Sequence, residues 1–238
     1  MPFETIQIAT ADGTAPACLY DRPGPGVLLL IDGIGMRPAM HEVGERLAAA
    51  GYRVLMPDVF YRLGAYTAPD ATQLFTDPTV RQQWFARASA STNPAAIMRD
   101  VPAYLDALGG ARAGVVGYCM GGRMALVTAA TYPDRVAAVA AYHPGGLVTD
   151  GDDSPHRLVG AIRARVYVGA ATDDGSFTDA DRQRFGDALR DGGVDHTIEV
   201  YPARHGWVPS DTPAHDAAAT ARHWETLLAL FAATLTPA

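Results

Sequence analysis

Hydrophobic residues in the middle of the chain form short, continuous runs instead of alternating strictly with polar ones. Such runs are typical of strands that are buried on both faces, as in a parallel sheet covered by helices. We predict strands at Thr5–Thr10, Ala17–Tyr20, Val27–Ile31, Arg53–Met56, Gly114–Tyr118, Val136–Tyr142, Arg165–Val168 and Thr197–Tyr201. The first two are expected to form an antiparallel hairpin that turns at residues 11–13.

Between these runs, apolar positions recur with the period of a helix. Helices are predicted at Ala39–Ala50, Thr79–Ala90, Pro94–Leu108, Met120–Thr131, Asp179–Asp191 and Pro213–Thr234. Tyr61–Pro78 and Asp150–Pro155 are interpreted as loops. Alternating strands and helices predict an α/β fold with a mostly parallel, eight-stranded sheet flanked by helices. The length of 238 residues and the absence of a linker favour one domain over residues 1–238.

Composition narrows the range of functions. The formal net charge is −7, and all 19 basic residues are arginine. Without lysine, Schiff-base catalysis and lysine-containing phosphate loops are excluded. The acidic balance argues against a nucleic-acid partner. No apolar run has the roughly 18 residues of a membrane span, and the N-terminus lacks a signal-peptide pattern, so we expect a cytoplasmic protein with no membrane partner.

The two cysteines, Cys18 and Cys119, lie too far apart in the sequence to form a zinc-binding pair. Cys119 stands in the segment Gly117-Tyr118-Cys119-Met120-Gly121-Gly122, between a predicted strand and a predicted helix. This is the pattern of a nucleophile elbow with cysteine as the nucleophile. The turn is so sharp that side chains at Gly117 and Gly121 would clash. The helix N-terminus favours a thiolate, and the N–H of Met120 can face an oxyanion.

An elbow enzyme places its acid and then its histidine later in the chain. Of the seven histidines, His205 follows the last strand and precedes the last long helix, so we predict that it is the catalytic base. Asp173 and Asp174 follow the strand Arg165–Val168 and compete for the role of the acid. We favour Asp174 because Gly175 permits a tight turn after it. In this hypothesis Asp174 orients His205, which activates Cys119.

The chain resembles the dienelactone hydrolase family of α/β-hydrolases. The resemblance covers nearly the whole chain and rests on the elbow, on Arg204-His205-Gly206, and on Ile31-Asp32-Gly33-Ile34-Gly35. It implies a compact fold without a large cap and hydrolysis of a small ester or lactone through a cysteinyl acyl-enzyme. It also implies that the N–H of Gly33 is the second oxyanion donor, beside that of Met120. Neither a metal nor an organic cofactor is expected.

The resemblance also raises questions about two positions. The family has Glu where this chain has Asp32, which either modulates the nucleophile or bonds the N–H groups of its own turn. The family also binds a substrate carboxylate with arginines, one of them four positions past the histidine, where this chain has Pro209. Arg37, Arg62, Arg81 and Arg123 remain candidate anion partners. A less polar ester or lactone is therefore an equally good substrate hypothesis.

Two alternatives to a hydrolase follow from the same residues. One is a non-catalytic relative that binds a small ligand in the same pocket, and the other is a thiol-based redox sensor. The sensor lacks an obvious resolving cysteine, because Cys18 should be distant from Cys119. A monomer and a homodimer are both compatible with the sequence.

Overall fold

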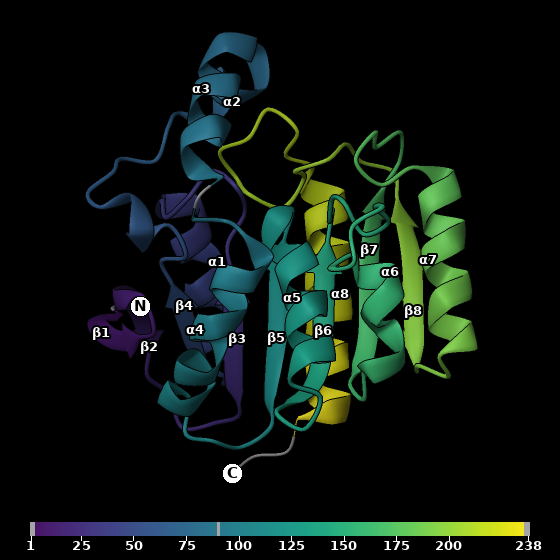
Figure 1. Ribbon diagram of the computed structural model, residues 1–238, viewed down its shortest axis with the longest axis horizontal. Helices are drawn as coiled ribbons and strands as arrows, with labels where there is room; N and C mark the ends of the chain where they lie inside the picture. The colour runs from purple at the N-terminus through teal and green to yellow at the C-terminus, as the bar shows by residue number, and fades with distance from the viewer. Residues whose placement is uncertain (1–2, 90, 236–238) are drawn as a thin grey trace.

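The computed structural model describes residues 3–89 and 91–235. It has one eight-stranded sheet with the order β1-β2-β4-β3-β5-β6-β7-β8 (Figure 1). The strands are β1 (Glu4–Thr10), β2 (Gly13–Tyr20), β3 (Gly26–Leu30), β4 (Arg53–Pro57), β5 (Ala113–Tyr118), β6 (Val136–Tyr142), β7 (Arg165–Ala171) and β8 (His196–Tyr201). β2 is antiparallel to β1 and β4, whereas the other neighbours are parallel. The predicted sheet and its hairpin edge are confirmed.

Helices cover both faces of this sheet. They are α1 (Pro38–Ala49), α2 (Ala71–Thr76), α3 (Pro78–Ala88), α4 (Pro94–Ala107), α5 (Met120–Thr131), α6 (Pro155–Leu158), α7 (Asp179–Asp191) and α8 (Ala217–Thr234), with 3-10 turns η1 (Tyr61–Leu63) and η2 (Val159–Ala161). Figure 1 shows α4, α5 and α6 in front of the sheet and α8 behind it. The guanidinium of Arg46 in α1 lies 4.4 Å from the ring centroid of Trp224 in α8, so these two helices share a face.

The core explains why the central strands consist of continuous apolar runs. All six residues of β5 are buried, as are four of the five residues of β3. Both strands have a parallel neighbour on each side and a helical layer on each face, so neither face needs polar residues. β8, at the edge, is only partly buried and carries charged and polar residues.

Three predicted boundaries were wrong. The supposed loop Tyr61–Pro78 contains α2, whose first turn is capped by the Asp70 side chain, an acceptor for the N–H of Gln73 at 2.9 Å. The last helix begins at Ala217 and not at Pro213, because Asp216 caps it by accepting the N–H of Ala219. The supposed loop Asp150–Pro155 runs into α6, which was not predicted. The predicted helix Thr79–Ala90 corresponds to α3, and its last position lies outside the described residues.

The sheet topology brings distant parts of the sequence to one edge. Because β3, β5, β6, β7 and β8 are parallel, the loops after them meet at their carboxyl ends, where open α/β sheets bind ligands. α2 and α3 stand above this edge in Figure 1. Within residues 3–89 and 91–235, no helix is long and apolar enough to span a membrane.

Candidate active site

Cys119 occupies the turn between β5 and α5. Its backbone has φ 53° and ψ −116°, a left-handed φ that a non-glycine residue rarely adopts. A Cβ at Gly117 would lie 2.0 Å from the carbonyl oxygen of Gly121, and a Cβ at Gly121 would lie 2.2 Å from that of Leu30. Both positions therefore require glycine. The turn holds the partly exposed thiol of Cys119 at the N-terminus of α5.

His205, from the loop after β8, lies beside this cysteine. Its Nδ1 is 2.6 Å from Oδ2 of Asp174, which follows β7. The same imidazole is hydrogen-bonded to the thiol of Cys119. Because Nδ1 is engaged by Asp174, Nε2 is the nitrogen that faces the sulfur. The structure thus brings together Cys119, His205 and Asp174, whereas the neighbouring Asp173 is exposed and has a left-handed φ of 53°.

Ser176 orients the carboxylate of Asp174, and we had predicted no role for it. Its hydroxyl donates to Oδ1 of Asp174 at 2.6 Å, and its backbone N–H donates to the same oxygen at 2.9 Å. The hydroxyl also lies 3.3 Å from Nδ1 of His205. Asp174 therefore has one oxygen fixed by Ser176 and the other directed at His205. An Asp followed two positions later by Ser is a common turn pattern and was the available signal.

The charges of the three groups support one another. Burial lowers the pKa of His205, but the charges and hydrogen bonds of Cys119 and Asp174 outweigh this effect and raise it to about 10. Burial raises the pKa of Asp174, yet the contacts with His205 and Ser176 lower it overall. At neutral pH, the imidazolium form of His205 is therefore favoured at this position beside Asp174 and Cys119.

Gly33 and Met120 lie side by side next to the thiol. A Cβ at Gly33 would be 3.9 Å from the Cβ of Met120 and 3.0 Å from the ring of Phe85. The indole N–H of Trp84 donates to the carbonyl oxygen of Gly33 at 2.8 Å and so fixes the peptide of the loop after β3. The two backbone segments predicted to supply oxyanion donors are thus neighbours, and Trp84 in α3 is buried against one of them.

Asp32 precedes this loop and is bound by arginine. Arg37 donates to both of its carboxylate oxygens, at 2.7 and 2.9 Å, and the N–H of Ile34 donates to Oδ1 at 3.0 Å. Asp211 contacts the same guanidinium at 2.7 Å. Both Asp32 and Arg37 are buried, so this candidate anion partner, Arg37, is already occupied by carboxylates of the chain. The contacts of the Asp32 carboxylate are those of a structural ion pair and of its own turn.

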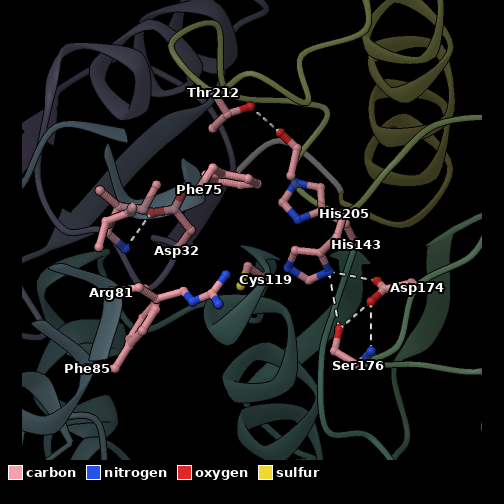
Figure 2. A pocket seen from close by; sticks show the side chains of 14 residues that line it. Asp32, Phe75, Arg81, Phe85, Cys119, His143, Asp174, Ser176, His205 and Thr212 are labelled. Atoms are coloured by element: carbon pink, nitrogen blue, oxygen red, sulfur yellow. Dashed lines mark hydrogen bonds and ion pairs between the residues drawn. The ribbon is translucent and has the colours of Figure 1, made fainter. Parts of the chain in front are cut away.

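A cavity of about 300 Å³ opens above Cys119, and we call it the Arg81 pocket. Its apolar lining includes Ile34, Leu74, Phe75 and Phe85, with Phe75 from α2 and Phe85 from α3. Figure 2 shows the side chain of Arg81, also from α3, extending into the pocket toward Cys119.

The four candidate anion partners differ in their contacts. The guanidinium groups of Arg37, Arg62 and Arg123 are each paired with aspartate. Arg81 has no carboxylate within ion-pair distance among the described residues. Sequence reasoning could not single it out, because its position depends on how α3 packs over the sheet edge.

The other histidines and Cys18 have different surroundings. His143 lines the Arg81 pocket, is fully buried, and packs edge-on against His205 with 5.3 Å between ring centroids. His223 is buried in α8, 2.9 Å from the hydroxyl of Tyr118. His215 lies before the first residue of α8, whereas the predicted helix Pro213–Thr234 had included it. Burial raises the pKa of the Cys18 thiol to about 11. Within the described part of the chain, no cluster of three or more His, Cys, Asp or Glu side chains could hold a metal ion.

Comparison with known proteins adds independent evidence. A carboxymethylenebutenolidase of Rhodococcus opacus is 30% identical over 123 residues, which is 52% of this chain and 45% of that protein. A protein of Methylorubrum extorquens, named as a candidate for the same activity, is 29% identical over 240 residues, covering 93% of this chain and 78% of the other. The shorter alignment spans less than half of the first relative.

Solved structures show the same fold. A candidate dienelactone hydrolase from Klebsiella pneumoniae superposes with a TM-score of 0.84 at 20% identity, over 97% of this chain and 98% of that one. A dienelactone hydrolase-like promiscuous phosphotriesterase from metagenomic libraries gives 0.75 at 24% identity, over 99% and 100%. These likenesses establish an α/β-hydrolase fold. The model of the dienelactone hydrolase family matches residues 14–235, so this chain belongs to that family.

Proposed function

We propose that the protein hydrolyses a small ester or lactone through Cys119, His205 and Asp174. The observation that carries this proposal is the contact of His205 with Asp174 on one side and with Cys119 on the other. The strained backbone of Cys119 supports it as well, since strain of this kind persists where the surrounding structure enforces it, often at active sites. Family membership favours the same reaction class.

The reaction would proceed in two halves. The thiolate of Cys119 attacks the carbonyl carbon, and the electron pair of the C=O bond moves to oxygen, which the N–H groups of Gly33 and Met120 stabilise. Collapse breaks the C–O bond as His205 protonates the leaving alkoxide. His205 then takes a proton from water, the hydroxide attacks the thioester, and the acid and the thiolate are released.

Arg81 favours a substrate with an anionic group. The name carboxymethylenebutenolidase describes a lactone that bears a carboxyl group. In this chain the position four residues after the histidine holds Pro209, but the guanidinium of Arg81 reaches into the pocket from α3. We propose that it binds a carboxylate on the acyl part of the substrate.

Assays with an activated aryl ester and a dienelactone test the reaction. Cys119→Ala and His205→Ala should each lower kcat/KM by at least about 1000-fold, because the catalytic groups act as a unit. Cys18→Ala is the matched control and should leave kcat/KM unchanged. If the parent protein cleaves neither substrate but still binds them, it is a non-catalytic relative. If Cys119→Ala hydrolyses them as fast as the parent, the proposed nucleophile is wrong.

Arg81 is tested with a substrate pair that differs in charge. For an ester with a carboxylate on its acyl part, Arg81→Gln should raise KM about 10- to 100-fold, the usual range for a lost charged hydrogen bond. The corresponding neutral amide-bearing ester should be affected much less. Arg87→Gln removes the same charge from the same helix away from the pocket, and it should change neither KM. If Arg81→Gln and Arg87→Gln change the KM of the carboxylate-bearing ester equally, Arg81 does not bind the substrate carboxylate.

A further inference from the structure

A second cavity reaches the same catalytic residues from another side. It has a volume of about 520 Å³, and we call it the Arg123 groove. Its walls include Thr92, Met120, Arg123, Gly146 and Asp153. Cys119, Ser176 and His205 line both this groove and the Arg81 pocket. The nucleophile and its base therefore lie where two separate cavities meet, whereas a small lactone needs only one.

The two cavities differ in chemical character. The Arg81 pocket is mainly apolar and has Phe75 and Phe85 in its wall, although Asp32, His143 and Thr212 line it beside Arg81 and the catalytic groups. The groove presents polar side chains from Thr92, Arg123 and Asp153. Arg123 is paired with Asp153 at 3.1 Å, so the charges of the groove are balanced. An anionic group is therefore attracted to the Arg81 pocket, whereas the groove suits a neutral, partly polar group.

The mechanism of hydrolysis indicates which part of the substrate, acyl or alcohol, each cavity binds. His205 protonates the departing alcohol and later deprotonates the attacking water, so both molecules occupy the same place beside its ring. That place must be open to water while the acyl group is still attached to sulfur. The groove meets this requirement better than the smaller pocket beside Phe75 and Phe85, because it is wider and the charged pair Arg123–Asp153 lines it.

We propose that the Arg123 groove binds the alcohol part of an open-chain ester and then admits the water that hydrolyses the acyl-enzyme. The substrate class is thus wider than small lactones: it includes esters with a neutral alcohol part of several carbon atoms. This inference rests on the proposed hydrolase function, because it assigns the parts of the substrate to either side of the same nucleophile.

Two isomeric esters separate the groove from the pocket. Benzyl acetate has its aromatic group on the alcohol side, and methyl phenylacetate has it on the acyl side. Thr92→Trp, which fills the groove, should lower kcat/KM at least tenfold for benzyl acetate. It should change kcat/KM less than twofold for methyl phenylacetate and for methyl acetate. Thr131→Trp places the same ring at the C-terminal end of α5, outside both cavities, and it should leave all three values within twofold.

A second measurement does not depend on how much active enzyme a variant retains. With methyl phenylacetate as the acyl donor, added benzyl alcohol competes with water for the acyl-enzyme and forms benzyl phenylacetate. The ratio of this ester to phenylacetic acid should fall at least tenfold in Thr92→Trp. Asp153→Trp fills the groove from an exposed loop and should lower the ratio too, whereas Thr131→Trp, outside both cavities, should not.

Either of two results would overturn the assignment of the groove. One is an unchanged ratio in both Thr92→Trp and Asp153→Trp, and the other is a loss of activity on methyl phenylacetate that exceeds the loss on benzyl acetate. If the parent protein cleaves none of the three esters or the dienelactone, the proposed function fails as a whole. If the parent cleaves them and these two tryptophan variants keep its preference, only the assignment of the groove fails.

Discussion

Asp32 and Asp174 follow two strands of the same sheet, β3 and β7, and both carboxylates are buried. Each accepts a hydrogen bond from the backbone N–H two residues later, that of Ile34 at 3.0 Å and that of Ser176 at 2.9 Å. Their charged partners differ. Asp32 is held by Arg37, which stays protonated at any ordinary pH, whereas Asp174 is held by His205, which can release its proton.

This difference separates a structural carboxylate from a candidate catalytic one. Arg37 donates to both oxygens of Asp32, so the charge of that carboxylate is balanced within the ion pair. Asp174 directs one oxygen at an imidazole that also contacts Cys119. Burial and turn geometry are nearly the same at the two positions, so the partner decides what each aspartate contributes. Substitutions at both positions can test this comparison.

The largest effect is expected from Asp174→Asn. The amide keeps the shape of the side chain but cannot stabilise the imidazolium, and it can hold the wrong tautomer of His205. We expect kcat to fall by about 10,000-fold, as is typical for this change in a catalytic triad. Asp173→Asn is the matched control, because its side chain is exposed on the adjacent position. A loss confined to Asp173→Asn would refute the assignment of the acid.

Asp32→Asn should act on stability and not on chemistry. Removing one partner of a buried ion pair leaves an uncompensated charge and costs about 3–5 kcal/mol of unfolding free energy. We expect the lower end, because Asp211 still contacts Arg37. Asp211→Asn removes the more exposed carboxylate and should cost about 1 kcal/mol or less. Denaturant unfolding gives both values. If Asp32→Asn unfolds like the parent but lowers kcat more than tenfold, Asp32 modulates the nucleophile.

The stability that each ion pair contributes, Asp174–His205 or Asp32–Arg37, should also depend differently on pH. The pKa of His205 is raised from 6.5 to about 10 in the folded protein. The stabilising contribution of its charge is therefore complete below pH 6.5 and is lost as the pH rises toward 10. Arg37 does not titrate in this interval. The stability difference between the parent and His205→Gln should shrink from pH 6.5 to 10, whereas the cost of Asp32→Asn should stay constant. If the stability costs of His205→Gln and Asp32→Asn decline equally over this pH range, the comparison is wrong.

The smallest effect is expected from Ser176→Ala. The variant loses the 2.6 Å hydrogen bond to Asp174 and keeps the backbone donor to the same oxygen. A hydrogen bond to a charged group contributes about 1.5–3 kcal/mol, so we expect kcat to fall about 10- to 100-fold. The acid limb of the pH–rate profile should move to higher pH, because Ser176 helps to lower the pKa of Asp174. Ser176→Thr keeps the hydroxyl and should restore the profile. An unchanged profile in Ser176→Ala would exclude this positioning role.

The sequence predicted those parts of the fold and site that depend on local geometry. The turn at Cys119 has to have glycines at 117 and 121, because a Cβ there would collide with backbone, so the motif can be read directly. The continuous apolar runs of β3 and β5 likewise follow from burial on both faces. His205 was predicted because the order of nucleophile, acid and histidine along the chain is a property of the fold.

Other features depend on tertiary packing that no local pattern reports. α2 has only six residues, too few for a helical period to be recognised, so Phe75 was assigned to a loop. Arg81 lines the pocket because α3 lies over the sheet edge. Arg37, which pairs with Asp32, also binds Asp211, 174 positions further along the chain. Even the preference for Asp174 rested on Gly175, whereas the structure shows Ser176 holding that carboxylate.

Trapping the acyl-enzyme tests the central claim most directly. An ester with a slowly hydrolysed acyl group would be mixed with the protein, quenched in acid during turnover and examined by intact mass with fragment mapping. We predict that the parent gains one acyl group, that it maps to Cys119, and that Cys119→Ala gains none while Cys18→Ala behaves like the parent. Turnover of the ester with no adduct on Cys119 during the steady state, and at an undiminished rate in Cys119→Ala, would contradict the account.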